Sequence, residues 1–254
     1  MLKKVASNTI SQILSKVFTA IISIFLISSL TKYLSPEMYW QYNKIYNYLS
    51  IFTFLADLGL YTISVREISK DKENASRIIG NVMSLRFVLW FWIIFLSILI
   101  ALFLPGYNTT VSLISIFIIS IFSVFSLMNS SVISLMQSFM KVEFSSMTFV
   151  VGKIVNLLLI FSVIFILYPK WDTLSFDMAF IWIMISWLLG IMVNFFMNLY
   201  YANKIARVRF LFDWEYMKHL FKISLPNGIA LFLSVVYFKV DVIIISLLEW
   251  WSKA

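Results

Sequence analysis

The sequence is a succession of apolar stretches separated by short charged joints. A helix of about 20 apolar residues is long enough to cross about 30 Å of hydrocarbon. Seven stretches reach that length, at residues 8–32, 42–65, 78–104, 110–138, 146–168, 174–201 and 223–248. Only 13% of the 254 residues are charged, whereas a typical soluble domain has about 25%. The pattern therefore predicts an all-α integral membrane protein with seven transmembrane helices.

The first apolar stretch is expected to remain in the mature protein. It lacks the small-residue cleavage site that follows the short apolar core of a signal peptide. Polar residues recur along it at helical spacing and so share one face: Thr9, Gln12, Lys16, Thr19 and Ser23. We expect this face to point away from lipid.

Basic residues gather at alternate joints. The N-terminus, residues 66–77, Lys141 and residues 204–222 hold most of the 20 lysine and arginine residues. Because cytoplasmic loops carry an excess of such residues, this bias predicts a multi-pass protein of the cell (cytoplasmic or inner) membrane with a cytoplasmic N-terminus. It also accounts for the net charge of +8, so the lipid bilayer is the expected partner and nucleic acid is not.

Several short motifs together resemble a family of membrane transporters. They are LSPEMY at residues 34–39, ADLGL at 56–60, Arg86 in the third stretch, SLP at 224–226 and KVD at 239–241. Their order along nearly the whole chain is similar to that of the polysaccharide-exporting flippases. These are the O-antigen and capsule repeat-unit transporters of the multidrug/oligosaccharidyl-lipid/polysaccharide superfamily.

The resemblance implies a fold and a transport activity. Family members form a V-shaped bundle of two six-helix lobes, which moves a polyprenyl-pyrophosphate-linked oligosaccharide across the membrane by alternating access. With seven spans where the family has twelve or fourteen, the chain is expected to be truncated. Residues 1–203 would be the N-terminal lobe, 204–222 a cytoplasmic amphipathic connector, and 223–254 the first helix of an incomplete second lobe. Besides the lipid-linked oligosaccharide, a polysaccharide polymerase and glycosyltransferases are candidate partners.

Tryptophan departs from the family pattern at two positions. Trp40 stands where the family normally has glycine after the tyrosine, and Trp90 stands where a glycine would fit. The chain has 6 Gly and 9 Trp, although glycine is usually about 7% of residues. Two explanations stay open: a glycine codon of the source translated here as tryptophan, or ordinary interfacial tryptophan. The peptide mass at Trp40 in the native protein distinguishes them.

Ionisable residues inside the stretches are the candidate site residues. Arg86 lies about nine residues into its stretch, or about 13 Å deep, where an arginine normally faces a cavity or a partner. It could contact the pyrophosphate of a lipid carrier, or form a structural pair with Asp57. Asp57 could alternatively bind a coupling proton or cation, and Asp241 is a second candidate for coupling or ion pairing.

Three further residues are candidates for a cavity that binds substrate. Lys153 and Asn156 are three apart and share a helical face, where the amide could bind sugar hydroxyls. Lys16 belongs to the polar face of the first stretch, but its side chain could instead extend to the cytoplasmic interface.

Other functions were weighed against the flippase prediction. A multidrug or small-cation exporter of the related branch needs an acidic cavity. The intramembrane carboxylates are Asp57 and Asp241, whereas the cations are Lys16, Arg86, Lys153 and Lys239. A non-transporting membrane assembly subunit is the remaining alternative. There is no cysteine, no H-E-x-x-H and no G-x-S-x-G, so we expect neither an enzyme nor a cofactor or metal site.

Overall fold

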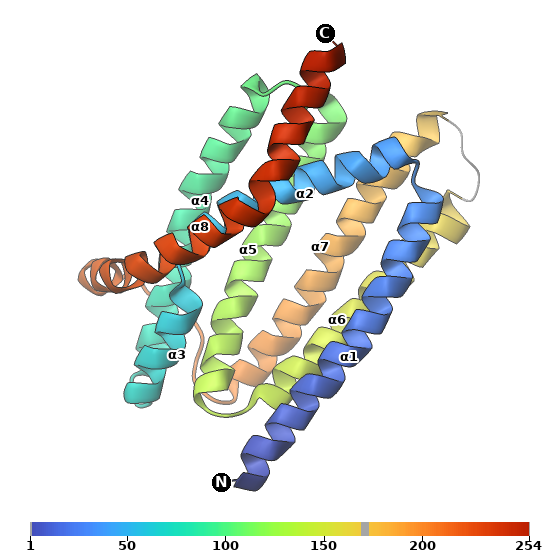
Figure 1. The fold of residues 1–254 in the computed structure, drawn as a ribbon. Helices are drawn as coiled ribbons and strands as arrows, with labels where there is room; N and C mark the ends of the chain where they lie inside the picture. The colour runs from blue at the N-terminus through green and yellow to red at the C-terminus, as the bar shows by residue number, and fades with distance from the viewer. Residues whose placement is uncertain (1, 169–172, 254) are drawn as a thin grey trace.

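The chain folds into a bundle of long helices (Figure 1). The structure is a computed structural model that describes residues 2–168 and 173–253, and this part of the chain contains no strand. The expected joint at residues 169–172 lies outside the described residues. The elements are α1 (Leu2–Tyr33), α2 (Pro36–Asp57), α3 (Leu60–Lys70), α4 (Ala75–Phe103), α5 (Thr110–Ser138), α6 (Val142–Ser162), the π-helix η1 (Val163–Leu167), α7 (Thr173–Asn203) and α8 (Trp214–Lys253).

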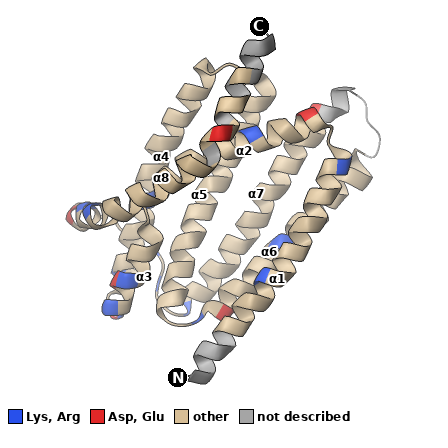
Figure 2. Cartoon of the chain, viewed as in Figure 1, with Lys and Arg blue, Asp and Glu red and all other residues tan. Residues whose placement is uncertain are grey.

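The helices confirm the predicted all-α membrane fold. Within the described ranges, seven helical segments are long and apolar enough to cross a membrane, and α2 with α3 counts as one of them. Figure 2 shows that α5 and α7 run for most of their length without a charged residue. The expected spans correspond to these segments in order, and the differences lie at their ends and at one internal break.

The joint between α1 and α2 is shorter than the sequence suggested. The apolar pattern predicts that the second span starts near residue 42. Instead, Pro36 occupies the first turn of α2, after the N-cap residue Ser35, whose hydroxyl accepts a hydrogen bond from the Met38 N–H at 3.4 Å. Proline suits this position because its fixed φ is helical and its missing N–H would have no partner there. The hydroxyl cap and the proline together place the start of α2 at Pro36.

The second span is broken between α2 and α3. Leu58 and Gly59 both have left-handed backbone conformations, with φ of 46° and 69°. Such a φ is uncommon for leucine and easily adopted by glycine. Helix α8 packs directly on this break, because a Cβ atom added to Gly228 would lie 2.8 Å from the Leu58 Cα. The glycine at 228 therefore allows the two backbones to touch.

The last helix begins earlier than predicted. Residues 204–213 are not helical, and α8 then runs for 40 residues through Pro226. Figure 1 shows that α8 bends along its course, as expected where a proline removes a backbone hydrogen bond. The non-helical segment is attached to the start of α4, since the Asp213 N–H donates to Asn81 Oδ1 at 2.8 Å.

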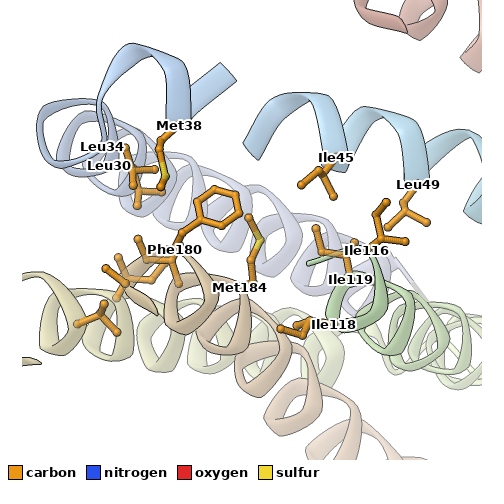
Figure 3. Close-up of a cluster of buried hydrophobic side chains, with 14 of the residues drawn as sticks. Leu30, Leu34, Met38, Ile45, Leu49, Ile116, Ile118, Ile119, Phe180 and Met184 are labelled. Atoms are coloured by element: carbon orange, nitrogen blue, oxygen red, sulfur yellow. The ribbon is translucent and has the colours of Figure 1, made fainter. Parts of the chain in front are cut away.

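Two apolar clusters hold the bundle together. The first joins α1, α2, α4, α5, α6 and α7, and Figure 3 shows part of it, including Leu30, Met38, Ile45, Ile116 and Phe180. The second joins α3, α4, α5, α7 and α8, and includes Ile63, Ile79, Leu135, Ala202 and Leu220. Helices α4, α5 and α7 contribute to both clusters, and α5 packs against α7 along the middle of the bundle. The candidate site lies beside these two helices.

Candidate functional site

Three adjoining hollows lie between α1, α2, α5, α6 and α7. Their volumes are about 260, 190 and 350 Å³. Phe122 of α5 lines all three, so they are neighbours. We name them the Asp57 hollow, the Lys153 hollow and the tyrosine hollow, after residues that line them. Each lies within segments that can span a membrane, where polar side chains are costly and therefore informative.

The Asp57 hollow is rich in hydroxyl groups. Asp57, at the end of α2, is accompanied by the side chains of Ser50, Thr53, Ser123, Ser126 and Ser130. Small hydroxylated residues let helices pack closely and also offer hydrogen-bond partners where a cavity opens. Three of these residues, Ser123, Ser126 and Ser130, belong to α5.

Arg86 lies behind the Asp57 hollow and does not line it. Its side chain is completely buried, and its guanidinium donates to an Asp57 carboxylate oxygen. The other terminal nitrogen donates to the Leu127 carbonyl at 3.0 Å and to the Ser131 hydroxyl at 2.6 Å. The structure thus brings Arg86 and Asp57 together as an ion pair, with Asp57 21% exposed on the cavity side. This arrangement corresponds to the pairing alternative.

The Lys153 hollow lies between α6 and α7. Its polar lining consists of Ser126, Lys153, Asn156, Trp187 and Asn194. The Lys153 ammonium lies 5.0 Å from the centre of the Trp187 ring, a cation–π contact. Among the residues that the structure describes, Lys153 and Asp57 are the charged side chains that line the three hollows.

Two glycines bring α6 and α7 into close contact at this hollow. A Cβ added to Gly152 would lie 3.0 Å from the Asn194 Cβ, and one added to Gly190 would lie 3.0 Å from the Asn156 Cβ. Each helix therefore carries Gly-x-x-x-Asn, and each asparagine lies over the glycine of the other helix. Small residues at a helix crossing allow such close approach in membranes.

The asparagines of this crossing are held by one end of their amide groups. The Asn156 Nδ2 group donates to the Ser186 carbonyl at 3.0 Å. The Asn194 Oδ1 atom accepts from Asn129 at 2.7 Å and from Asn198 at 3.0 Å. The opposite ends, Asn156 Oδ1 and Asn194 Nδ2, are buried and have no hydrogen-bond partner, and the same is true of Trp187 Nε1. Three unpaired polar groups thus belong to side chains that line one hollow.

The tyrosine hollow completes the cavity on the side of α2. Tyr39, Tyr42 and Tyr46 line it, and their successive ring centres are 6.2 Å apart. Lys153 and Trp187 line this hollow as well, so it opens onto the Lys153 hollow. These tyrosines were not predicted from the sequence, although their spacing of three and four residues on a helix is a readable signal.

Two of the predicted site residues lie away from the hollows. Lys16 is exposed on α1, which agrees with a side chain that extends toward the interface. Asp241 is exposed on α8, and its carboxylate accepts from the Val242 N–H at 2.8 Å. Neither residue lines the cavity, whereas Asp57, Lys153 and Asn156 do.

Trp90 lies in the wall behind the Asp57 hollow. Its indole N–H donates to the Ser123 hydroxyl at 2.8 Å and to the Ser120 carbonyl at 3.1 Å. Trp40 lines a shallow depression with Pro36 and Ile245. The indole of Trp90 is thus part of the contact between α4 and α5.

Apolar helices around a cavity that carries Asp57, Lys153 and several hydroxyl and amide groups define a multi-pass α-helical membrane protein. The comparison with known families gives the particular group. Residues 5–249 match the model described as "Polysaccharide biosynthesis protein", which covers nearly the whole chain, and the chain therefore belongs to that family. No curated protein and no solved structure matches it.

Proposed function

We propose that the chain moves polyprenyl-pyrophosphate-linked oligosaccharide repeat units across the cytoplasmic membrane by alternating access, with its N-terminus in the cytoplasm. The family supports a role in polysaccharide synthesis, and the seven apolar segments support a role within the bilayer. The observation that carries the proposal is the charge of the cavity. Lys153 offers a cation to the hollows, while the Asp57 carboxylate is already paired with Arg86.

An anionic substrate follows from this balance. A lysine within a membrane span is costly and is usually retained for a partner or a substrate. Among the described residues, the ion pairs leave Lys153 without a carboxylate partner. A phosphate or an acidic sugar would supply the missing negative charge, and the surrounding hydroxyl and amide groups suit sugar hydroxyls.

The paired state of Asp57 argues against the alternative of a cation exporter. Such a transporter needs a carboxylate that is available to a cationic drug or to a coupling ion. In this structure, the Asp57 carboxylate already compensates Arg86, whose side chain is completely buried. Using Asp57 for a cation would leave the arginine charge unbalanced inside the membrane, at a cost of several kcal/mol.

We also propose a division of the chain. Residues 1–203 form a six-helix lobe, residues 204–222 connect it on the cytoplasmic side, and residues 223–254 provide the first helix of a second lobe. The hollows would then form one wall of a central cavity that the second lobe faces. The attachment of residues 204–213 to α4 supports a connector that is fixed to the first lobe.

Reconstitution tests the proposed function. The purified 254-residue chain is placed in liposomes that contain a fluorescent polyprenyl-pyrophosphate oligosaccharide, and an impermeant quencher reports the fraction of label in the outer leaflet. We expect exchange between leaflets that is faster than in protein-free liposomes and slower in Lys153→Gln. Folded protein that causes no exchange would overturn the proposal. Ethidium transport without lipid exchange would favour the multidrug branch.

A further inference from the structure

Four polar groups on side chains that line the Lys153 hollow have no hydrogen-bond or carboxylate partner among the described residues. Two are buried donors, Trp187 Nε1 and Asn194 Nδ2, and one is a buried acceptor, Asn156 Oδ1. The fourth is the Lys153 ammonium, which contacts the Trp187 ring and has no carboxylate partner in the described ranges. Buried polar groups without partners are uncommon in proteins, and several in one hollow indicate a missing partner.

These groups are held rigidly. Asn156 and Asn194 are each only 2% exposed, and each amide is fixed at its other end by a hydrogen bond. The close approach at Gly152 and Gly190 leaves little room for the asparagine side chains to turn. The free donors and the free acceptor therefore have set positions, which lowers the entropy cost of binding a ligand.

The kinds of group present define the ligand. An indole N–H, an amide N–H and an ammonium can only donate, so each requires an oxygen that accepts hydrogen bonds, and the ammonium favours a charged one, such as a carboxylate or phosphate oxygen. Asn156 Oδ1 can only accept, so it requires a donor such as a hydroxyl. A sugar unit that carries an acidic group supplies both.

The adjoining tyrosine hollow suits the sugar rings of the same ligand. Tyr39, Tyr42 and Tyr46 form a stacked row along α2, with ring centres 6.2 Å apart. The row covers about 10 Å of helix, since seven residues separate its ends. Aromatic faces pack against the C–H faces of pyranose rings, and each tyrosine adds a hydroxyl that can donate and accept. The shared lining residues Lys153 and Trp187 place the row beside the cation.

We infer that the two hollows together bind an anionic sugar: its carboxylate or phosphate group lies at Lys153 and Trp187, its hydroxyl groups lie at Asn156 and Asn194, and the neighbouring rings lie along the tyrosine row. The inference rests on the proposed function for its biological meaning, because it names the chemical class of the repeat unit. The same chemistry arises from a hexuronic acid within the repeat unit or from a sugar phosphate at its reducing end.

Binding measurements on the reconstituted chain test the inference. The full 254-residue chain in lipid nanodiscs is titrated with four probes. Saturation-transfer NMR detects the binding of each probe to the protein, and the titration gives its affinity. Tetragalacturonate carries carboxylates, glucose 1-phosphate carries a phosphate, maltotetraose is a neutral oligosaccharide of matched length, and inorganic phosphate has no ring. We expect at least one of the two anionic sugars to bind at least tenfold more tightly than maltotetraose and than inorganic phosphate. Preference for tetragalacturonate would indicate the hexuronic acid, and preference for glucose 1-phosphate the sugar phosphate.

Substitutions locate the binding. Lys153→Gln removes the charge, and Trp187→Phe keeps a ring but removes the N–H donor, so both should weaken binding of the preferred anionic sugar about tenfold. Two matched controls should bind as wild type. Trp182→Phe alters a 43% exposed tryptophan of the same helix, and Lys204→Gln alters a lysine that lies 4.2 Å from the Tyr200 ring and outside the hollows. Circular dichroism checks that each variant is folded.

Three results would overturn the inference. These are equal binding of neutral and anionic sugars, inorganic phosphate binding as tightly as either anionic sugar, and wild-type affinity in folded Lys153→Gln. The assay contains no polyprenyl carrier and no transport step, so it is independent of the flipping assay. A chain that binds anionic sugars without flipping lipid would retain this inference and lose the proposed function. A chain that flips lipid and binds all sugars equally would retain the proposed function and lose this inference.

Discussion

Two arginines of α4 form ion pairs in contrasting surroundings. Arg77, near the start of the helix, lies 2.7 Å from the Asp213 carboxylate, and the two side chains are 59% and 36% exposed. Arg86 pairs with Asp57, and its own side chain is fully buried. The same two kinds of residue thus meet once at the edge of the bundle and once inside it.

The contrast shows that surroundings, and not the pairing itself, determine what an ion pair contributes. Water and salt screen an exposed pair, so its loss has little effect on stability. A buried pair contributes little beyond apolar residues of similar size, but the removal of one partner leaves an uncompensated charge. We therefore expect a large loss of stability when one partner of the Arg86–Asp57 pair is removed. Removing one partner of the Arg77–Asp213 pair should change stability little.

The largest effect is expected from Asp57→Leu. This substitution leaves the Arg86 charge buried without its partner, which should lower the free energy of unfolding by about 3–5 kcal/mol. Unfolding by increasing detergent denaturant, followed by circular dichroism, measures the change. Asp241→Leu is the control because Asp241 is an exposed carboxylate within α8, and its effect should be much smaller. Equal effects of the two substitutions would refute the contrast.

The double variant Asp57→Leu, Arg86→Leu should recover most of the lost stability. It replaces the whole pair with apolar side chains, so no charge is left unbalanced. The same double variant also tests whether Arg86 has a role in transport. If Arg86 contacts the pyrophosphate, the double variant and Arg86→Ala should insert into the membrane and fail to flip lipid. Normal flipping by the stable double variant would exclude that contact.

An intermediate effect is expected from Gly228→Ala. The new methyl carbon would lie 2.8 Å from the Leu58 Cα, next to Asp57, so α8 or the break in the second span must shift. Such overpacking typically costs about 1–3 kcal/mol. The loss of stability should also persist when Arg77 is replaced by alanine, because the Arg77–Asp213 pair shares no residue with the contact between Gly228 and Leu58. Wild-type stability of Gly228→Ala would show that this contact is not tight.

The smallest effect is expected from the exposed pair. The hydrogen bond from Arg77 lowers the pKa of the Asp213 carboxyl group. A carboxyl group whose pKa is lower in the folded state adds stability above its unfolded pKa of about 3.9, and this contribution is lost as the pH falls through the folded pKa. Asp213→Asn should therefore show a slightly smaller drop in melting temperature between pH 6 and pH 3 than wild type. A larger drop in the variant would contradict the sign.

The sequence predicted the fold because length and hydropathy determine which segments can cross a bilayer. It did not predict the break at Leu58 and Gly59, since a left-handed leucine leaves no local signal. That conformation is formed where α8 contacts the chain about 170 residues later in the sequence. The early start of α2 at Pro36 was readable, because a hydroxyl cap followed by proline is a helix-start signal.

The candidate site was predicted in part. Lys153 and Asn156 were placed on one face by their spacing alone, and both line the Lys153 hollow. Trp187 and Asn194 could not be assigned to the same hollow, because their position depends on how α7 is rotated against α6. The repeated Gly-x-x-x-Asn pattern of residues 152–156 and 190–194 was the available signal. Asn194 also bonds to Asn129 and Asn198, but with its oxygen alone.

The buried pair has a consequence for how the protein is made. Asp57 and Arg86 are 29 residues apart and belong to two consecutive spans, so the carboxylate leaves the ribosome first. An isolated helix that carries an arginine near its centre inserts poorly, at a cost of about 3 kcal/mol. The Asp57 carboxylate of the preceding span, which is synthesised first, offsets that cost by pairing with Arg86. The second and third spans are therefore expected to leave the translocon together, as a hairpin, and not one after the other.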